Sequence, residues 1–299
     1  MKKFMPVTLA VRDTTKKFML VALAMILTLS AFSLPSVSGS VQVRQAQAQG
    51  NTSENEDFVV FQAAGPTAAS IQNTVDAYRV ALGDPNNGNA PGQPSGRREI
   101  NWDGGSTTNL NTVVSGSTLA NFQNTRGTLF TTPGTGFVQA PASADPVQFP
   151  PGGLAGLFNN PTYGNIFTPF SDSRLFSAIG SNITDVTFFV PVAPGGSNEP
   201  ATVTGFGVVF TDVDKRGNGN AGARIEYFDA DGDLLFSSFV PALQGNGSLS
   251  FFGIVFDDDA PIARVRITSG NVAPGPDDGG RRDVVMMDDF IYGEPQALP

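Results

Sequence analysis

The sequence predicts an all-β protein, a β-sandwich or jelly roll with one short N-terminal helix and long ordered loops. Its 299 residues are only 15% charged and include 34 Gly and 22 Pro, a composition typical of strands joined by many turns. From residue 174 onward, short β-like runs alternate with turn signals such as Asp231-Gly232. Only one segment has a convincing helical period. These features indicate one sandwich domain, which we expect over residues 96–299.

The first 48 residues are expected to form a signal peptide. A basic start is followed by the apolar run 18–32, which is too short for a comfortable membrane span, and Ala46-Gln47-Ala48 offers an A-x-A cleavage site. Cleavage nearer Ser40, or retention as an N-terminal anchor, are the alternatives. We therefore expect a secreted protein, extracellular or periplasmic, that is not inserted in a membrane after the signal is removed.

Residues 49–95 are expected to be an N-terminal extension that carries the helix. Ile71, Val75 and Tyr78 recur at helical spacing within residues 68–82, and Gly83 ends the pattern. The next residues, 84–96, are a loop by composition, because they are rich in Pro, Asn and Gly.

The remaining expected elements are strands, recognised by runs of β-formers between turns. They cover residues 58–61, 98–102, 128–131, 136–139, 174–179, 184–192, 201–211, 223–228, 234–240, 248–256, 262–268 and 284–292. Residues 141–171 show little periodicity, and we interpret them as a long ordered loop held by phenylalanines.

Charge and missing residue types exclude several functions. Without residues 1–48, the chain has 12 Lys or Arg against 26 Asp or Glu, a formal charge of −14. Such a surface repels nucleic acid and attracts divalent cations, so no nucleic-acid partner is expected. The chain has no Cys and no His, which excludes the usual zinc sites and Ser-His-Asp or Cys-His catalysis. An oxygen-coordinated ion, Ca²⁺ as a structural cofactor, is the metal expected in a secreted protein.

Aspartates gather at the ends of the later strands, with 13 of them between residues 212 and 289. Asp212 and Asp214 are two apart after an apolar run, so in a strand both carboxylates point the same way and could converge on one ion. Asp288 and Asp289 interrupt the buried-looking run VVMMDDFIY, where carboxylates are costly unless paired or metal-bound. All four are candidate metal ligands.

Two other aspartate groups favour simpler interpretations. Residues 229–233 (DADGD) resemble the start of an EF-hand loop, but Leu234 replaces the glycine and Val240 the bidentate glutamate that such a loop needs. A hairpin turn is the expected structure. Residues 257–259 are expected to be a solvated turn.

The stretch GRREINWDGG (96–105) contains the only Trp and three residues with acid or amide side chains, Glu99, Asn101 and Asp103, that could take part in catalysis or bind a metal. In a regular strand Glu99 and Asp103 lie about 13 Å apart, too far for a glycosidase pair at about 5–9.5 Å. Asn101 and Asp103 share a face and are further candidate metal ligands. Trp102 falls on the opposite face and is expected in the core.

A resemblance rests on six phrases: GRREINWDG, SNITDVTFFVP, GFGVVFTDVD, EYFDADGDLL, FFGIVFDDDAPIARVRITSGN and DVVMMDDFIYGEP. Together they resemble an uncharacterised family of secreted bacterial proteins, which has no established activity to transfer. The C-terminal half is similar to jelly-roll modules that bind carbohydrate and hold a structural calcium. The resemblance thus implies a fold and a class of ligand, and no catalytic residues.

These observations favour a secreted, non-catalytic binding module, stabilised by calcium, that contacts polysaccharide or a cell-surface glycan. A glycoside hydrolase or lyase using carboxylates is one alternative, although one Trp and four Tyr provide few aromatic rings for an extended sugar cleft. A structural protein of the cell envelope or matrix is the other alternative.

Overall fold

The computed structural model describes residues 57–104, 112–144, 151–215, 217, 222–257 and 261–298, and the backbone of residues 39–45. These described residues belong to one compact unit. Most of the predicted signal peptide therefore lies outside the described residues.

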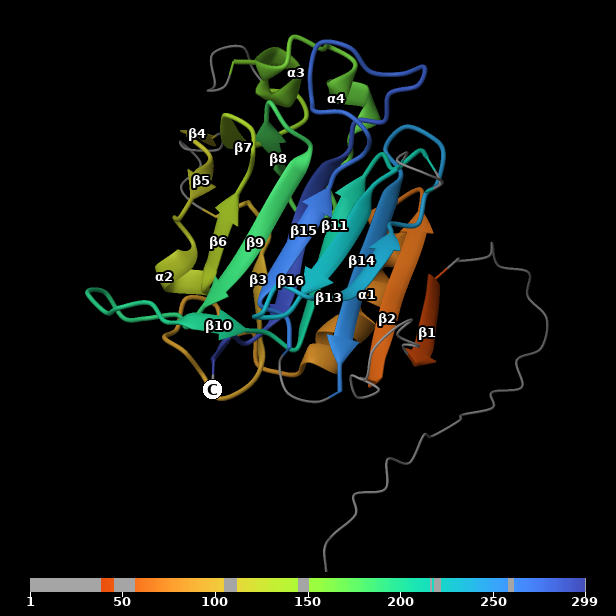
Figure 1. Ribbon diagram of the computed structural model, residues 1–299. Helices are drawn as coiled ribbons and strands as arrows, with labels where there is room; N and C mark the ends of the chain where they lie inside the picture. Colours follow the sequence, from red (N-terminus) through yellow and green to blue (C-terminus); the bar gives the residue numbers. More distant parts are fainter. Residues whose placement is uncertain are drawn as a thin grey trace, which may run out of the picture. The chain divides into compact units, whose positions relative to one another are not determined.

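Most strands with long apolar runs belong to a first sheet. Its strands are β1 (Gly39–Gln45), β2 (Asp57–Gly65), β3 (Arg97–Ile100), β4 (Thr112–Ser115), β7 (Gly136–Ala140), β8 (Leu175–Ile179), β11 (Gly205–Thr211), β14 (Leu249–Phe256) and β16 (Met286–Gly293). Within the described residues this sheet has nine strands in the order β1-β2-β14-β11-β16-β8-β7-β4, with β3 also paired to β16 (Figure 1). Every pairing in it is antiparallel.

The central strands of the second sheet alternate buried and part-exposed residues. Its strands are β5 (Thr118–Leu119), β6 (Thr128–Thr131), β9 (Ile183–Phe189), β10 (Pro200–Thr202), β12 (Arg224–Phe228), β13 (Leu234–Phe239), β15 (Arg264–Thr268) and β17 (Gln296–Ala297). In the described part of the chain the order is β13-β12-β15-β9-β10-β17, with β6 on β9 and β5 on β6. Buried and part-exposed residues alternate along β9, so one face of this strand lies toward the core and the other toward solvent, as expected for an antiparallel sheet.

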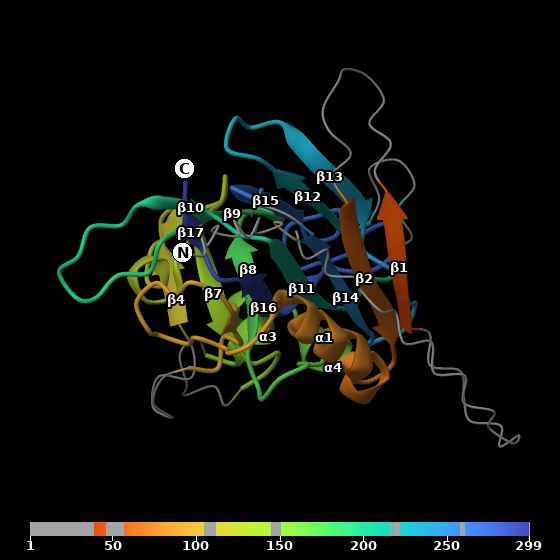
Figure 2. The same cartoon turned by 90° about the horizontal axis from the view of Figure 1, so that it is seen from below.

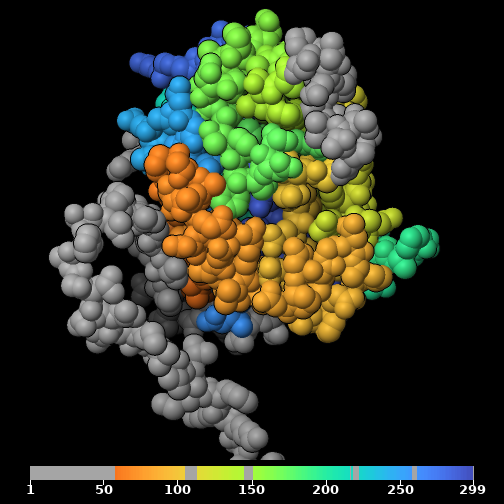
Figure 3. All heavy atoms as spheres, turned by 180° about the vertical axis from the view of Figure 1, so that it is seen from behind, coloured from red at the N-terminus to blue at the C-terminus, as the bar shows by residue number. Residues whose placement is uncertain are grey.

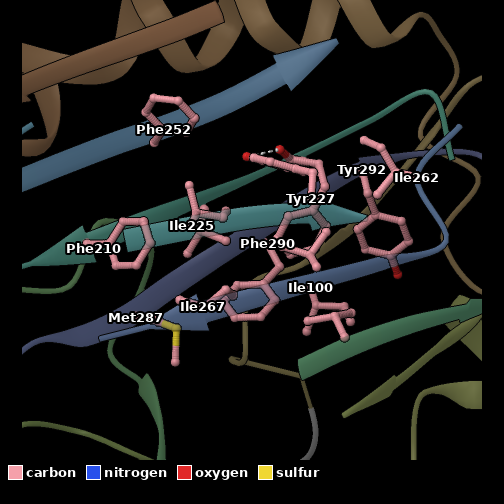
Figure 4. Packing of buried hydrophobic residues seen from close by; sticks show 14 of the residues in the cluster. Ile100, Phe210, Ile225, Tyr227, Phe252, Ile262, Ile267, Met287, Phe290 and Tyr292 are labelled. Atoms are coloured by element: carbon pink, nitrogen blue, oxygen red, sulfur yellow. Dashed lines mark hydrogen bonds between the residues drawn. The ribbon is translucent and has the colours of Figure 1, made fainter. Parts of the chain in front are cut away.

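The two sheets pack face to face and enclose the main core (Figure 2). Phe206, Val208 and Phe210 of β11 point into it, and they meet residues such as Ile225 and Tyr227 of the second sheet. Figure 4 shows this packing, in which the Tyr227 hydroxyl donates to the Phe206 carbonyl at 3.0 Å. The predicted all-β sandwich with a short N-terminal helix is confirmed.

The first sheet is buried on both faces, which explains its unbroken apolar strands. Its outer face is covered by α1 (Ala68–Leu82), the one long helix among the described residues (Figure 2). Tyr78 of this helix packs where Gly207 and Gly253 lie side by side, and a Cβ at either glycine would come within 2.9 Å of the tyrosine ring. The glycines therefore permit the helix to approach the sheet closely.

Several short helices lie in the connections: α2 (Gln123–Arg126), α3 (Gly153–Leu157) and α4 (Tyr163–Ile166). The last two cover a small apolar cluster at one end of the sandwich, next to the loop before β16 (Figure 1). The residues expected to form a long ordered loop thus contain two helical turns. Figure 3 shows the face behind, where α1 (orange) lies beside the green segment that leads into β8.

The predicted helix boundaries agree with α1 at both ends. Two strand predictions need correction. The run 201–211 is divided into β10 and β11, and β3 ends at Ile100 because Trp102 has a φ of 62°. Residues expected as an N-terminal extension supply β2, which pairs with β14 inside the first sheet. Among the described residues there is no helix with the length and apolar character needed to cross a bilayer.

Candidate functional site

The main candidate site is a pocket at the end of the sandwich that carries α3 and α4, and we call it the acidic pocket. It has a volume of about 360 Å³, and its lining includes four aspartates, one arginine (Arg282) and residues of α4 and its flanks. The aspartates are Asp212, Asp214, Asp278 and Asp283. Asp212 and Asp214 follow β11, whereas Asp278 and Asp283 come from the loop before β16. Two distant segments of the chain thus bring carboxylates to one hollow.

Asp212 is held in an unusual backbone conformation. It has a φ of 67°, in the left-handed region that side chains other than glycine rarely adopt, and its amide donates to the Ser248 carbonyl at 2.8 Å. The residue is 6% exposed, and its Oδ1 is buried without a hydrogen-bond partner. Burial, and next the charges of Asp214 and Asp283, raise the pKa of Asp212 to about 7.

Asp283 has a second unpartnered oxygen. Its Oδ1 accepts a hydrogen bond from the Asp214 amide at 3.2 Å, but its buried Oδ2 has no partner, and the residue is 4% exposed. Burial raises its pKa, against hydrogen bonds from the amides of Asp214 and Lys215. A buried carboxylate oxygen without a donor costs free energy, and both this oxygen and Asp212 Oδ1 lack a compensating partner.

The nearby cationic side chains do not fill this role. Lys215 Nζ donates to the carbonyls of Arg282, at 3.0 Å, and Gly280. Arg282 forms an ion pair with Asp277 at 3.3 Å. Both cations are therefore engaged at the rim, and neither has a hydrogen bond to the unpartnered oxygens of Asp212 or Asp283.

Oxygen-rich pockets of this kind suit Ca²⁺, which takes six to eight oxygen ligands in flexible geometry. Asp212 and Asp283 could supply the buried ligands, and Asp214, Asp278 and Asn246 the outer ones. No three acidic side chains among the described residues stand at metal-ligand spacing. A cation would thus require Asp214 or Asp278 to turn toward the two buried aspartates.

A second group of carboxylates meets at one hydroxyl, and we call it the Ser171 cluster. Ser171 Oγ lies 2.6 Å from Asp289 Oδ1, 3.1 Å from Asp288 Oδ1 and 3.2 Å from Asp103 Oδ2. The amides of Phe170 and Ser171 donate to Asp288 Oδ2 at 2.6 and 3.3 Å. The structure thus brings together three of the six predicted metal ligands.

The outer side of this cluster is neutralised by an arginine of α1. Arg79 donates to Asp289 Oδ2 at 3.3 Å and to both oxygens of Glu99 at 2.9 to 3.2 Å. On the inner side Asp103 Oδ1 accepts from the amides of Ser173 and Arg174, at 3.1 and 2.9 Å. Unlike Asp212 and Asp283, none of the three aspartates of this cluster has a buried oxygen without a hydrogen-bond partner in the described part of the chain.

The pKa values of Asp288 and Asp289 are both raised. Burial, and next the charge of Asp289, raise the pKa of Asp288 well above its ordinary value. Burial also raises the pKa of Asp289, while Ser171, Asp288 and Arg79 act in the opposite direction. A proton held between two adjacent buried carboxylates is the simplest way to lower their repulsion.

Asn101 is separated from Asp103, although the two are predicted on one face. Asn101 is exposed and lines another pocket, and its Oδ1 lies 3.4 Å from the Asp103 amide. The left-handed backbone of Trp102 between them breaks the strand alternation on which that prediction rests. Trp102 itself is 2% exposed and stacks on Phe176 at 3.8 Å, so its predicted core position is confirmed.

The predicted hairpin at residues 229–233 is confirmed. It joins β12 to β13, and Asp229 Oδ1 accepts from the Asp233 amide at 2.8 Å. Asp257 is exposed, whereas residues 258 and 259 of the predicted solvated turn lie outside the described residues.

Sequence reasoning missed Asp283 as a member of the acidic pocket. Asp212 and Asp214 were found by their spacing of two residues, but Asp283 stands alone before the run Val284–Val285. A lone acid directly before a buried strand is the only signal in the sequence, and it does not identify a partner 69 positions away.

Comparison with known proteins identifies no relative, since no family model, no curated protein and no solved structure matches the chain. The resemblance to secreted bacterial proteins and to carbohydrate-binding jelly rolls therefore stays a prediction.

Proposed function

We propose that this chain is a secreted, non-catalytic binding protein whose β-sandwich takes up a calcium ion in the acidic pocket. The proposal rests on one observation, the two buried carboxylate oxygens of Asp212 and Asp283 that have no hydrogen-bond partner. They come from two segments that are already joined by hydrogen bonds, from the Asp214 amide to Asp283 and from Lys215 Nζ to the Arg282 carbonyl. An ion here would join the end of β11 to the loop before β16.

Stacking of a sugar ring on an exposed Trp or Tyr does not contribute to the proposed glycan binding. Trp102 is 2% exposed, and the four tyrosines, Tyr78, Tyr163, Tyr227 and Tyr292, have no exposed surface. These side chains belong to the core and provide no platform on which a sugar ring could stack. Contact with a glycan would depend instead on hydrogen bonds from polar side chains.

A thermal melt of the protein with calcium and with chelator tests the proposal. Extracellular modules often bind calcium at about 10⁻⁴–10⁻³ M, so about 10 mM calcium is suitable. At about 100 times the dissociation constant, binding to the native state adds about 2.7 kcal/mol, which raises Tm by about 5–10 °C in a chain of this size. An unchanged Tm would refute the calcium proposal.

Asp283→Asn is the variant that assigns the effect to this pocket. In chelator we expect a Tm equal to or above that of the unchanged protein, because a buried negative charge is removed. In calcium we expect no rise. Asp231→Asn, at the exposed tip of the β12–β13 hairpin, is the matched control and should keep the full calcium response.

A further inference from the structure

A pocket between β3, α2 and β7 differs from the acidic pocket in chemistry, and we call it the amide pocket. It has a volume of about 220 Å³, and its polar lining includes the carboxamides of Asn89, Asn101, Asn121 and Gln139. They come from four separate segments of the chain. None of the described lining residues is acidic, although the chain as a whole carries a net charge of −9.

Arg126, the last residue of α2, contributes the charge of this pocket. Its Nη1 donates to the Glu99 carbonyl at 2.9 Å, and no carboxylate of the described residues lies within ion-pair distance. Burial, assisted by the charge of Arg98 and opposed by Tyr292 and Glu99, lowers the pKa of Arg126. Within the described residues this half-buried guanidinium thus forms no direct ion pair, unlike Arg97 and Arg98.

The neighbouring arginines make the contrast clear. Arg97 pairs with Glu99 at 2.8 Å, and Arg98 forms a fully buried pair with Glu294 at 2.7 Å. Arg98 also donates to the Thr125 carbonyl at 3.1 Å, which fixes the backbone next to Arg126. In a protein with more acidic than basic residues, an arginine without a carboxylate in a fixed pocket indicates an anionic ligand.

The floor of the pocket is rigid. It includes Trp102, whose indole packs edge-on against Phe122 and Phe290 and donates to the Asp288 carbonyl at 3.0 Å. Its φ of 62° is uncommon for a bulky side chain, and such strained conformations concentrate at ligand sites. Trp102 is thus held in a costly conformation in the lining that it shares with the amides and the arginine.

The lining indicates the class of ligand. Carboxamides both donate to and accept from hydroxyl groups, and a guanidinium binds a carboxylate in a planar, charge-assisted geometry. The pocket is smaller than the roughly 300–1,000 Å³ of sites for drug-sized ligands, so it suits a single ring. We propose that the amide pocket binds a uronic acid, with its carboxylate on Arg126 and its hydroxyls on the surrounding carboxamides.

This assignment deepens the proposed binding function by naming the ligand, and it uses no residue of the acidic pocket. The same chemistry is offered by a free sugar acid and by the end of an acidic polysaccharide. A monosaccharide and an oligosaccharide of galacturonate distinguish these sources. Tighter binding of the oligosaccharide indicates a polysaccharide end, and equal binding indicates the free acid.

Calorimetric titration with sodium glucuronate and sodium galacturonate tests the proposal, with glucose and galactose as neutral counterparts. We expect the uronates to bind at least 10-fold more tightly than the neutral sugars. Arg126→Gln should weaken uronate binding at least 10-fold, and Asn121→Ala, at an exposed position, several-fold. Arg281→Gln removes the same charge from an exposed site and should leave binding unchanged.

Three outcomes would overturn the assignment: no binding of either uronate, equal binding of the neutral sugars, or equal loss in Arg126→Gln and Arg281→Gln. Each titration is run in calcium and in chelator to separate the two proposals. Uronate binding that persists in chelator supports the amide pocket even if the calcium melt fails. Binding abolished by chelator and by Asp283→Asn would place the uronate at the acidic pocket instead.

Discussion

The acidic pocket and the Ser171 cluster both contain buried aspartates, but the carboxylates of the two groups differ in their hydrogen-bond partners. In the Ser171 cluster the carboxylates of Asp288 and Asp289 accept hydrogen bonds from the Ser171 hydroxyl, from backbone amides and from Arg79. In the acidic pocket Asp212 and Asp283 each keep one oxygen without a donor. The number of carboxylates therefore does not distinguish the two groups, whereas the oxygens without a hydrogen-bond partner do.

The contrast also explains why the two groups should respond differently to mutation. Removing a donor from the Ser171 cluster leaves a buried charge without compensation, which costs stability. Removing a charge from the acidic pocket relieves an existing cost and abolishes a ligand. The first two predictions below remove a donor from the Ser171 cluster, whereas Asp283→Asn, described above, removes a charge from the acidic pocket.

The largest effect is expected for Arg79→Met, which removes the guanidinium from Asp289 and Glu99 but keeps much of the apolar stem. The carboxylate of Asp289 is 4% exposed, so we expect a loss of about 3 kcal/mol in the free energy of unfolding, measured by urea denaturation. Arg224→Met, at a more exposed ion pair with Glu226, should lose less than about 1 kcal/mol. Equal losses in the two variants would show that Arg79 has no special role.

A smaller loss is expected for Ser171→Ala. The change removes the hydroxyl at which Asp103, Asp288 and Asp289 meet, and we expect a cost of about 2 kcal/mol by urea denaturation. Ser197→Ala, in an exposed loop, should change stability by less than about 0.5 kcal/mol. If Ser171→Ala were also neutral, the carboxylates would not depend on this hydroxyl.

The smallest effect, and the opposite sign, is expected for Asp288→Asn. Because the folded-state pKa of Asp288 is raised above 3.8, the folded protein holds the proton more tightly than the unfolded chain does. Stability therefore falls as pH rises from about 4 through the raised pKa. The variant lacks this titration, so it should lose less stability between pH 5 and pH 8 and be about 1 kcal/mol more stable at pH 8.

The pH dependence of Asp288→Asn is compared with that of Asp231→Asn, whose side chain is exposed. Urea denaturation at several pH values gives both slopes. Parallel slopes for Asp288→Asn and the unchanged protein would contradict a proton bound at this pair.

The strands and α1 could be predicted because their signals are local. Ile71, Val75 and Tyr78 repeat at helical spacing, and all three are buried against the first sheet. The split of residues 201–211 and the end of β3 were missed, since each depends on the conformation of a few residues. For Trp102 that conformation is fixed by contacts with Phe176 and the Asp288 carbonyl, which come from distant strands.

The candidate sites were only partly predictable, for the same reason. Spacing along a strand indicates Asp212 and Asp214 as candidate metal ligands, and an interrupted apolar run indicates Asp288 and Asp289. Which of these lack a donor depends on Ser171, Arg79 and the amides near them, and no local pattern shows where those groups lie. The amide pocket had no sequence signal, because its side chains come from four segments.

Calcium titration by calorimetry tests the distinction between the two groups of aspartates most directly. We predict one calcium bound per chain, absent in Asp283→Asn and retained in Asp288→Asn. Failure of the unchanged protein to bind calcium would contradict the account. So would loss of binding in Asp288→Asn with retention in Asp283→Asn, because the ion would then lie at the Ser171 cluster.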